Sequence, residues 1–354
     1  MAKRVLVVDD SALMRRLITS VLTEAGYQVE TANTGKQGVE KLVQWHPDAV
    51  TLDINMPEMD GLTALSLMMA ARPTPVVMVS SLTVEGALAT LEALALGAVD
   101  FITKPGGTIS LTIEDIQEQL LDKVKAACRS RPRDATQPAL PRRANVRPDA
   151  RPQPTTARAR QQADCPGMVL VGVSTGGPRT LEDLLPHLPE DFPLPVLVCQ
   201  HMPANFTDAF AQRMDRLCPL RVREVNTPLP IEPGHIYIGK GGTDMTITER
   251  LGRLVAMPKP ETPGHPWHPS VDVMVDAALR HVEASKLIGV MLTGMGNDGA
   301  QAMTRLKQQG GRTIAESEAT AVVFGMPHEL INAGGATLVL PSHQIARQLK
   351  GWLH

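Results

Sequence analysis

The segment Val5-Leu6-Val7-Val8-Asp9-Asp10 joins four apolar residues directly to two acidic residues. A short apolar run of this kind, bounded by polar residues, is typical of a fully buried β-strand. Helical patterns separate this segment from further strand-like runs at residues 28–32, 49–52, 76–79 and 101–103. Alternating strands and helices predict an α/β domain with a doubly wound parallel sheet of five strands.

Acidic residues collect where the predicted strands end. Asp9 and Asp10 follow the first strand, and Asp53 follows the third. Ligands of such sheets bind beyond the carboxyl ends of the strands, so neighbouring strands would bring the three carboxylates together. Because like charges repel one another, a cation is expected among them. Oxygen ligands with room for water favour Mg²⁺.

The last two predicted strands end in Ser80 and Lys104. A hydroxyl and an ammonium at these positions can hold the oxygens of a phosphoryl group on Asp53, since carboxylate nucleophiles form aspartyl phosphates. A simpler interpretation is that polar residues at strand ends only cap the helices that follow. Complementary polar residues on four strand ends favour the phosphoryl site.

Four segments that contain these residues closely resemble the receiver domain of two-component response regulators: residues 7–11, 52–61, 79–81 and 101–105. The resemblance implies a flavodoxin-like sheet with strand order 2-1-3-4-5, and Mg²⁺-dependent phosphorylation of Asp53 by a sensor histidine kinase. It also implies Mg²⁺ ligation by Asp9, Asp10, Asp53 and the backbone carbonyl of Asn55, and phosphoryl sensing by Ser80, Lys104 and the switch aromatic Phe101.

Residues 129–165 differ sharply in composition from the sequence on either side. They carry nine Arg, no Lys and three Asp, for a net charge of +6, whereas residues 1–128 carry −6 and residues 166–354 carry −2. Six Pro and few aliphatic residues leave this segment unable to form a core. We therefore expect a first domain at 1–128, a flexible Arg/Pro-rich linker at 129–165 and a second domain at 166–354. Nucleic-acid binding by the basic linker is an alternative, but a solvated tether between acidic domains is the simpler interpretation.

The second domain opens with a strand-like run, Met168–Val173, that leads into Ser174-Thr175-Gly176-Gly177. Residues 172–176 fit the pattern G-x-S-x-G, in which a sharp strand-to-helix turn exposes a serine hydroxyl. The glycines permit the turn, and the N-terminus of the following helix offers N–H groups to an oxyanion. Small residues are common in β–α turns, so this motif alone is a weak signal.

A histidine and an aspartate follow two further predicted strands. His201 follows the run at 195–200, and Asp298 follows the run at 286–293. At neighbouring strand ends, His201 would reach Ser174 as a general base, and Asp298 would orient the imidazole and stabilise its protonated form. The chain order Ser, His, Asp differs from the Ser, acid, His order of the α/β-hydrolase fold, which argues against that fold.

Two other classes of protein remain as alternatives. Residues 294–299 match the dinucleotide fingerprint G-x-G-x-x-G, with Glu316 and Glu318 near the expected ribose-binding acid, which suggests a nucleotide-binding oxidoreductase. Against this, Asp298 would repel a pyrophosphate. A response regulator with a DNA-binding output would need a basic helix-turn-helix domain, whereas residues 166–354 are acidic.

Five segments of the second domain look like the catalytic domain of the CheB family, the chemotaxis response-regulator protein-glutamate methylesterases: residues 172–177, 200–207, 269–273, 292–300 and 324–327. The order of receiver, linker and second domain is also that of the family. The resemblance implies that Ser174 is the nucleophile, His201 the base and Asp298 the orienting acid. It further implies that the backbone N–H of Met295 stabilises the oxyanion, with Thr175 as a helper.

The same resemblance implies a phosphorylation-activated hydrolase of the doubly wound α/β class with a mainly parallel sheet. Such an enzyme would demethylate γ-glutamyl methyl esters on methyl-accepting chemoreceptors, release methanol and deamidate specific receptor glutamines. A chemotaxis sensor histidine kinase would be the phosphodonor, the unphosphorylated receiver would inhibit the cleft, and no cofactor is implied for ester hydrolysis. One departure is the segment at 236–242, which lacks a Pro that is usual in the family.

Composition predicts a cytoplasmic protein. No apolar run reaches the roughly 18 residues of a membrane span, and the run at 5–8 is too short for a secretory signal. Four Cys without a CxxC pair are typical of reduced thiols. Aromatic residues make up only 3 % of the chain, which disfavours a protein that stacks nucleic-acid bases. We therefore expect no nucleic-acid partner and no direct membrane insertion.

Overall fold

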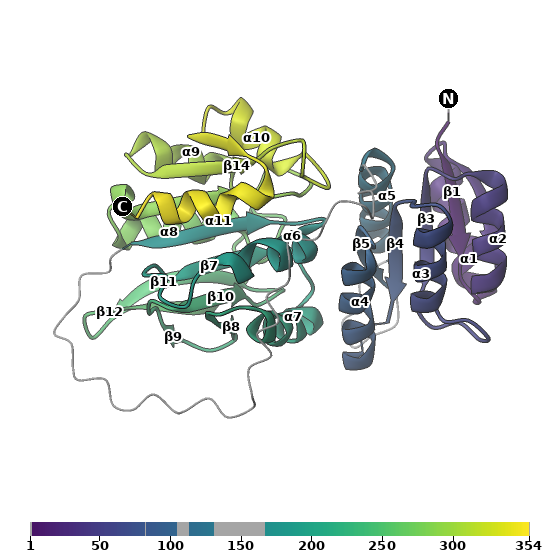
Figure 1. Cartoon of the computed structure of the whole chain (residues 1–354), viewed down its shortest axis with the longest axis horizontal. Coiled ribbons are helices and arrows are strands. Elements are labelled where there is room, and N and C mark those ends of the chain that lie inside the picture. The colour runs from purple at the N-terminus through teal and green to yellow at the C-terminus, as the bar shows by residue number, and fades with distance from the viewer. Residues whose placement is uncertain (1, 82, 105–112, 131–166, 354) are drawn as a thin grey trace. The chain divides into compact units, whose positions relative to one another are not determined.

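The computed structural model describes residues 2–81, 83–104, 113–130 and 167–353 (Figure 1). Its internal contacts divide the chain into two compact units, residues 1–138 and 139–354. Pro105 and residues 131–165 of the predicted linker lie outside the described residues, so the predicted domain boundaries remain a proposal. Within the described part, a helix continues to Arg129, the first residue of the predicted linker.

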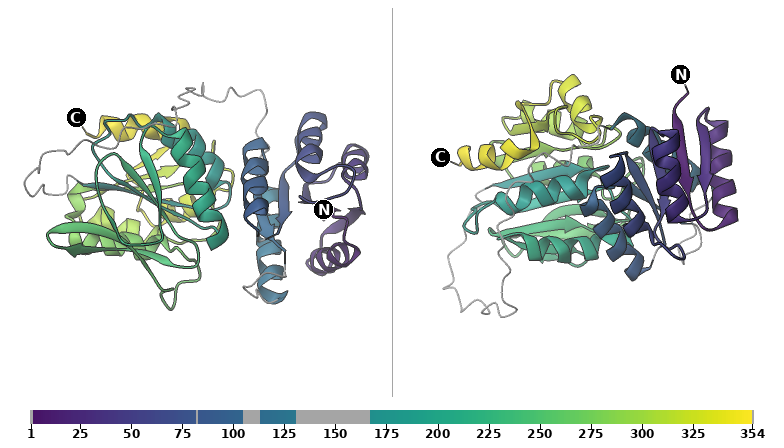
Figure 2. Two further views of the ribbon diagram at one scale, coloured as in Figure 1. Left: turned by 90° about the horizontal axis from the view of Figure 1, so that it is seen from below. Right: turned by 45° about the vertical axis from the view of Figure 1, so that its right-hand side comes forward.

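The first unit contains a five-stranded parallel sheet in the order β2-β1-β3-β4-β5, which confirms the predicted order. Its strands are β1 (Arg4–Val8), β2 (Gln28–Ala32), β3 (Ala49–Asp53), β4 (Val76–Ser80) and β5 (Asp100–Thr103). Its helices are α1 (Ala12–Glu24), α2 (Gly35–Trp45), α3 (Gly61–Ala71), α4 (Val84–Leu96) and α5 (Ile113–Arg129). Helices α1 and α5 pack together on one face of the sheet, and α2, α3 and α4 form a row on the other (Figures 1 and 2).

Polar residues in the strand-to-helix turns begin the helices of the first unit. Four side chains each accept a hydrogen bond from the backbone N–H three residues later: Ser11, Thr34, Asp60 and Thr83. These side chains satisfy backbone N–H groups that have no partner within the first turn of each helix. A Cβ at Gly61 would lie 2.1 Å from the carbonyl oxygen of Asp53, so only glycine lets α3 begin this close to the end of β3.

The second unit contains a seven-stranded sheet, parallel throughout, in the order β15-β14-β13-β6-β7-β10-β8. Its strands are β6 (Met168–Val173), β7 (Val196–Gln200), β8 (Arg221–Val225), β10 (His235–Gly239), β13 (Leu287–Met291), β14 (Arg312–Glu316) and β15 (Leu338–Leu340). A separate antiparallel sheet, absent from the sequence-based prediction, consists of β9 (Leu229–Pro230), β11 (Asp244–Arg250) and β12 (Arg253–Lys259).

Helices cover both faces of the seven-stranded sheet (Figures 1 and 2). One face carries α6 (Gly177–Leu184), α7 (Ala204–Leu217) and α11 (Ser342–Gly351), with the short 3₁₀ turn η1 (Leu185–His187). The other carries α8 (Val271–His281), α9 (Ala300–Gln308) and α10 (Met326–Asn332), and the turn η2 (Ala284–Lys286) precedes β13. The order of strands reverses between β6 and β13, which makes this the switch point where a ligand is expected.

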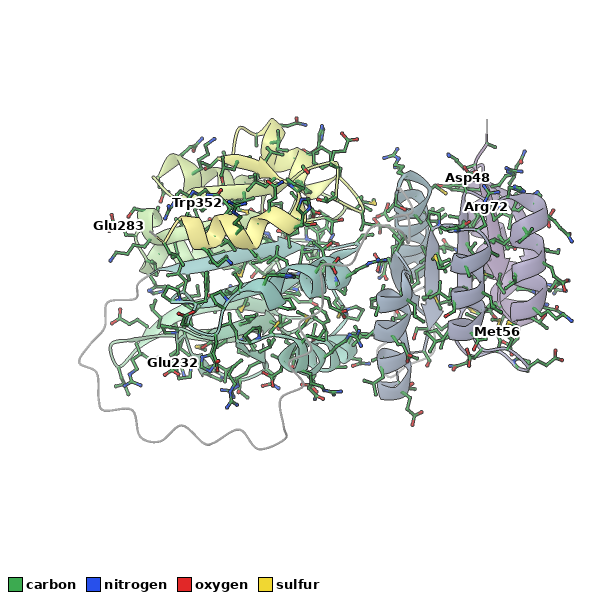
Figure 3. All side chains as sticks on the ribbon, viewed as in Figure 1. Asp48, Met56, Arg72, Glu232, Glu283 and Trp352 are labelled. Carbon is green, nitrogen blue, oxygen red and sulfur yellow. The ribbon has the colours of Figure 1, made fainter. Side chains whose placement is uncertain are left out.

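Surface contacts tie a terminal segment of each unit to its body (Figure 3). In the first unit, Asp48 accepts hydrogen bonds from the Lys3 ammonium and the Arg4 backbone N–H, both at 2.8 Å. In the second, the Arg312 guanidinium lies 4.9 Å from the centroid of the Trp352 ring.

No described helix combines the length and the apolar character that a membrane crossing requires.

Candidate active site and candidate metal centre

Two buried carboxylates and an ammonium meet at the carboxyl end of the first sheet. Lys104 Nζ lies 2.7 Å from Asp53 Oδ2 and 3.2 Å from Asp9 Oδ2. Asp9 and Asp53 are buried, while Asp10 is exposed beside them. The three residues converge because parallel pairing of β1 with β3, and of β4 with β3 and β5, brings all the carboxyl ends to one edge.

The pocket holds more negative than positive charge. Burial raises the pKa of Asp53 above its usual range and repulsion from Asp9 adds to the effect, while the Lys104 ammonium opposes it. Burial alone would lower the pKa of Lys104, but the neighbouring carboxylates of Asp53 and Asp9 raise it. Asp9, Asp10 and Asp53 offer oxygen atoms within 4.8 Å of one another, and this all-oxygen donor set fits Mg²⁺.

The other predicted receiver residues make contacts of other kinds. The Ser80 hydroxyl is buried and donates to the Gly86 carbonyl of α4 at 3.2 Å. Asn55 is exposed, and its N–H donates to Asp53 Oδ1 at 3.3 Å. The Phe101 ring is buried, with the Lys123 ammonium 5.0 Å from its centroid. Lys104 is therefore the one predicted sensing residue that contacts Asp53 within the described residues.

Neutralising Asp53 should stabilise the first unit. A carboxyl group whose pKa is raised by folding binds its proton more tightly in the folded state, so stability falls as pH rises from about 4 through the folded pKa. At pH 7 we expect Asp53→Asn to raise the free energy of unfolding by about 1 kcal/mol. Calorimetry of the full chain measures this as a higher melting temperature for the first unit, and the gain should disappear below about pH 4.

A matched control for this experiment is Asp122→Asn, which removes an exposed carboxylate on α5. We expect that variant to melt like the wild type. Added Mg²⁺ should raise the melting temperature of the wild type and have much less effect on Asp53→Asn, because a ligand stabilises only the state that binds it. If the wild type and Asp53→Asn had the same melting temperature at pH 7, the inferred excess of negative charge around Asp53 would be contradicted.

Ser174 lies in the turn between β6 and α6, where the G-x-S-x-G pattern predicts it. Its backbone N–H donates to the Thr293 carbonyl at 2.9 Å, and its carbonyl accepts from the Gly177 N–H at 2.8 Å. The residue is half-buried, and its hydroxyl makes no hydrogen bond to the described residues. The backbone is thus held from both sides while the hydroxyl remains available.

His201 and Asp298 come together at the ends of β7 and β13. Nε2 of His201 lies 2.8 Å from Oδ2 of Asp298. The His201 N–H donates to the carbonyl of Val173 at 3.0 Å, so the backbone of His201 lies beside Val173, the residue that precedes Ser174. In the described part of the chain, Nδ1 of His201 is buried without a hydrogen-bond partner. The structure therefore pairs the predicted base with the predicted acid, but forms no hydrogen bond between Ser174 and His201.

Asp298 is held as an anion by four donors. Oδ2 accepts from His201 Nε2 and, at 2.7 Å, from the Val271 N–H; Oδ1 accepts from the Ser270 hydroxyl at 2.9 Å and the Asp272 N–H at 3.1 Å. The backbone donors belong to the first turn of α8, whose positive end favours a negative charge. Burial alone would raise the pKa of Asp298, but the hydrogen bond and charge of His201 and the backbone donors lower it.

This pairing decides which nitrogen of His201 can act as a base. An ionised Asp298 can only accept, so Nε2 of a neutral imidazole carries the proton and Nδ1 carries the lone pair. Nδ1 is the nitrogen without a partner among the described residues. The ring is therefore used in the opposite sense to the familiar triad, in which the acid binds Nδ1 and the serine faces Nε2.

The loop after β13 lies directly against Ser174. A Cβ at Gly294 would be 2.7 Å from Ser174 Cβ, so the peptide between residues 294 and 295 borders Ser174. No described residue accepts a hydrogen bond from the Met295 N–H, which leaves it available to an oxyanion. The carbonyl of Thr175, the other predicted helper, accepts from the Thr293 hydroxyl at 2.9 Å. Both predicted oxyanion residues thus adjoin Ser174.

Two residues without a predicted role support the site. The Gln200 amide donates to the carbonyls of Ser174 and His201, both at 3.0 Å, and so joins the backbones of these two residues. Ser270 caps α8 and donates to Asp298. Ser270 precedes a helical pattern in the sequence, which is the signal of an N-cap, but its contact with Asp298 spans 28 residues and leaves no local signal.

Two other interpretations of this region are not supported by its contacts. Glu316, the candidate ribose-binding acid, is fully buried and accepts hydrogen bonds from the Thr293 N–H and the Thr320 hydroxyl. Three side chains, His265, Asp272 and Asp298, offer possible metal ligands within 4.8 Å of one another. Both oxygens of Asp298 already accept two hydrogen bonds each, so the cluster is better explained as the anchor of the imidazole.

Comparison with known families separates the chain into the same two parts. The CheB methylesterase family matches residues 169–349, and the response regulator receiver domain matches residues 5–114. The catalytic domain of CheB methylesterase from Thermotoga maritima has a TM-score of 0.50 and 38 % identity, over 52 % of this chain and 98 % of that domain.

Similar proteins also match over the whole length. The protein-glutamate methylesterase/protein-glutamine glutaminase 3 of Rhodospirillum rubrum is 52 % identical over 99 % of this chain and 96 % of the relative. A protein of the same description from Rhodopseudomonas palustris, numbered 2, is 50 % identical over 99 % of this chain and 98 % of the relative.

Proposed function

The chain belongs to the CheB methylesterase family, and from that premise we propose that Ser174, His201 and Asp298 hydrolyse γ-glutamyl methyl esters on chemoreceptors through an acyl-enzyme. The chain is a protein-glutamate methylesterase/protein-glutamine glutaminase of the response-regulator type. The observation that carries the proposal is the His201–Asp298 pair at the N-terminus of α8, with a free imidazole nitrogen beside the Ser174 turn.

In the first half of the proposed reaction, Ser174 Oγ attacks the ester carbonyl while Nδ1 of His201 takes its proton. The new imidazolium keeps its hydrogen bond to the anionic Asp298. The Met295 N–H, with Thr175 beside it, stabilises the negative charge that develops on the carbonyl oxygen. When the tetrahedral intermediate collapses, the C–O bond breaks and methanol leaves with the proton from His201.

In the second half, His201 takes a proton from water, and the resulting hydroxide attacks the acyl-enzyme. Collapse returns the proton to Ser174 Oγ and releases the glutamic acid side chain, which loses its remaining proton to solvent. A receptor glutamine would follow the same path with ammonia as the leaving group. No step requires a cofactor in the second unit.

The first unit is proposed to control this reaction. Asp53 would accept a phosphoryl group from a chemotaxis sensor histidine kinase, and Lys104 would hold the phosphoryl oxygens. Asp10, Asp53 and the Asn55 carbonyl, with Asp9, would hold Mg²⁺, which when bound offsets the negative charge of carboxylates and phosphoryl group. Ser80 would have to leave its bonds to α4 to reach that group, and such a movement would couple phosphorylation to α4.

Methanol release from methylated chemoreceptor membranes tests the proposal. Addition of acetyl phosphate and Mg²⁺ should accelerate release by the wild type, because phosphorylation shifts the population away from an inhibited form. Asp53→Asn should keep the unstimulated rate and lose the response. Residues 166–354 expressed alone should exceed the unphosphorylated full chain.

Each outcome of that assay bears on a different part of the proposal. If methanol release did not change with acetyl phosphate, and residues 166–354 alone were no faster than the full chain, the receiver would not control the esterase. Absence of release from every methylated receptor and from a generic ester would refute the esterase itself.

A further inference from the structure

The indole ring of Trp267 stacks on the imidazole of His201. The two ring centroids are 5.7 Å apart, and the ring planes differ by 2°. The edge of the same indole borders the loop after β13, since a Cβ at Gly296 would lie 2.6 Å from it. Trp267 therefore touches the base with its face and the loop of the oxyanion donor with its edge.

A buried carboxylate holds the segment that carries Trp267. Asp244, the first residue of β11, is fully buried. Its carboxylate accepts from the N–H of Thr262 at 2.8 Å, from Nδ1 of His268 at 2.9 Å and from the N–H of Ser270 at 3.0 Å. Because these donors lie on both sides of Trp267 in the sequence, one side chain closes the whole loop.

The hydrogen bonds of His201 do not by themselves fix the orientation of its ring. One hydrogen bond, from Nε2 to Asp298, holds the imidazole within its own plane. A single in-plane contact restrains rotation of the ring poorly, and Nδ1 has no partner among the described residues. A flat, nearly parallel indole against one face prevents the ring from turning, and an aromatic face also attracts a cation such as imidazolium.

We propose that Trp267 is a positioning residue that holds the His201 ring in the plane where Nδ1 faces Ser174 and stabilises the ring once it is protonated. The inference rests on the proposed function, because it assumes that His201 is the base. Its effect is greatest in the transition state, where the imidazole gains its charge, so loss of the stack lowers kcat more than it changes KM.

The test compares Trp267→Leu with Trp267→Phe in the full chain. Leucine keeps an apolar side chain and removes the aromatic face, whereas phenylalanine keeps both. Two measurements are made: kcat and KM for methanol release from methylated receptor membranes, and the rate at which a fluorophosphonate probe labels Ser174. The probe reports on the serine and its base without any receptor.

For Trp267→Leu we expect kcat and the labelling rate to fall together by about 10-fold, with KM within about 2-fold of the wild type. Trp267→Phe should retain at least about half of both rates. Trp352→Leu removes another half-buried tryptophan of the second unit and should match the wild type in both measurements. Equal melting temperatures of the three variants exclude a general loss of structure.

Three results would overturn the inference: labelling of Trp267→Leu at the wild-type rate, a change in KM with kcat preserved, or equal losses in the leucine and phenylalanine variants. Failure of the proposed function itself is distinguishable, because the wild type would then be labelled no faster than Ser174→Ala.

Discussion

Replacing Ser174 by alanine should lower kcat for methanol release by about 10⁴-fold or more. The hydroxyl is the proposed nucleophile, and without it only substrate binding and the oxyanion donors remain to assist water. The substitution should leave the fold intact, because the Ser174 hydroxyl makes no hydrogen bond to the described residues and its backbone bonds to Thr293 and Gly177 are retained. The measurement is methanol release from methylated receptor membranes at saturating acetyl phosphate.

The control is Ser285→Ala, which changes an exposed serine of η2 in the same unit and should be fully active. A double variant sharpens the test. If Ser174 and His201 act as one unit, replacing both by alanine should lower kcat no further than Ser174→Ala alone. Independent, multiplying losses would show that the two residues do not share a step, and a Ser174→Ala enzyme within about 10-fold of the wild type would rule out the serine as nucleophile.

Asp298→Asn should lower kcat by about 10⁴-fold while the chain still folds. The carboxylate accepts four hydrogen bonds, whereas an amide offers one accepting oxygen and an NH₂ group that donates. If the NH₂ group faces His201, Nε2 must accept, the proton moves to Nδ1, and the lone pair toward Ser174 is lost. If the NH₂ group faces the other way, it points at the Asp272 N–H, so two hydrogen-bond donors oppose each other without an acceptor. A steady-state measurement of kcat detects the loss in either case.

The same substitution should reduce stability by about 1–2 kcal/mol, because the first turn of α8 loses a buried anion. Since folding lowers the pKa of Asp298 below 3.8, its contribution is complete above the unfolded pKa and is lost as pH falls through the folded value. The difference in stability between the wild type and Asp298→Asn should therefore be constant above about pH 5 and shrink below about pH 4. Urea unfolding at several pH values measures it.

Asp276→Asn is the matched control. Asp276 lies on α8, the helix whose N-terminus binds Asp298; it is partly exposed and pairs with Arg305 at 2.7 Å. Surface pairs of this kind contribute little, so activity and stability should remain close to those of the wild type. An Asp298→Asn enzyme that keeps more than about a tenth of the wild-type kcat would contradict the role of the acid in selecting the tautomer.

Much of the site could be predicted because it lies at strand ends. Parallel strands deliver their carboxyl ends to one edge of a sheet, so Asp9, Asp53 and Lys104 are neighbours once three strands are recognised. The pairing of His201 with Asp298 follows in the same way from β7 and β13. Asp9, Asp53, Lys104 and His201 have a local signal, an apolar run that ends at the residue, whereas Asp298 lies in the glycine-containing loop that follows its run.

The supporting residues have no such signal. Asp244 begins a strand of an antiparallel sheet that the sequence pattern did not reveal, and it binds a loop 18 to 26 residues later in the chain. Trp267 reaches His201 only because that loop closes. Gln200 forms its bonds through a side chain that alternation assigns simply to the buried strand. Contacts between distant segments depend on how loops fold, and local periodicity carries no information about them.

The sequence by itself determined the α/β class, the two-unit organisation and the family of this protein, together with the residues that carry its proposed chemistry. Those features can be predicted from short apolar runs and from the polar residues that follow them. The tertiary structure alone decided which nitrogen of His201 binds Asp298, that the N-terminus of α8 holds Asp298 as an anion, and that Trp267 stacks on His201. Orientation is a property of side chains packed from separate segments, so it exists only once those segments have been brought together.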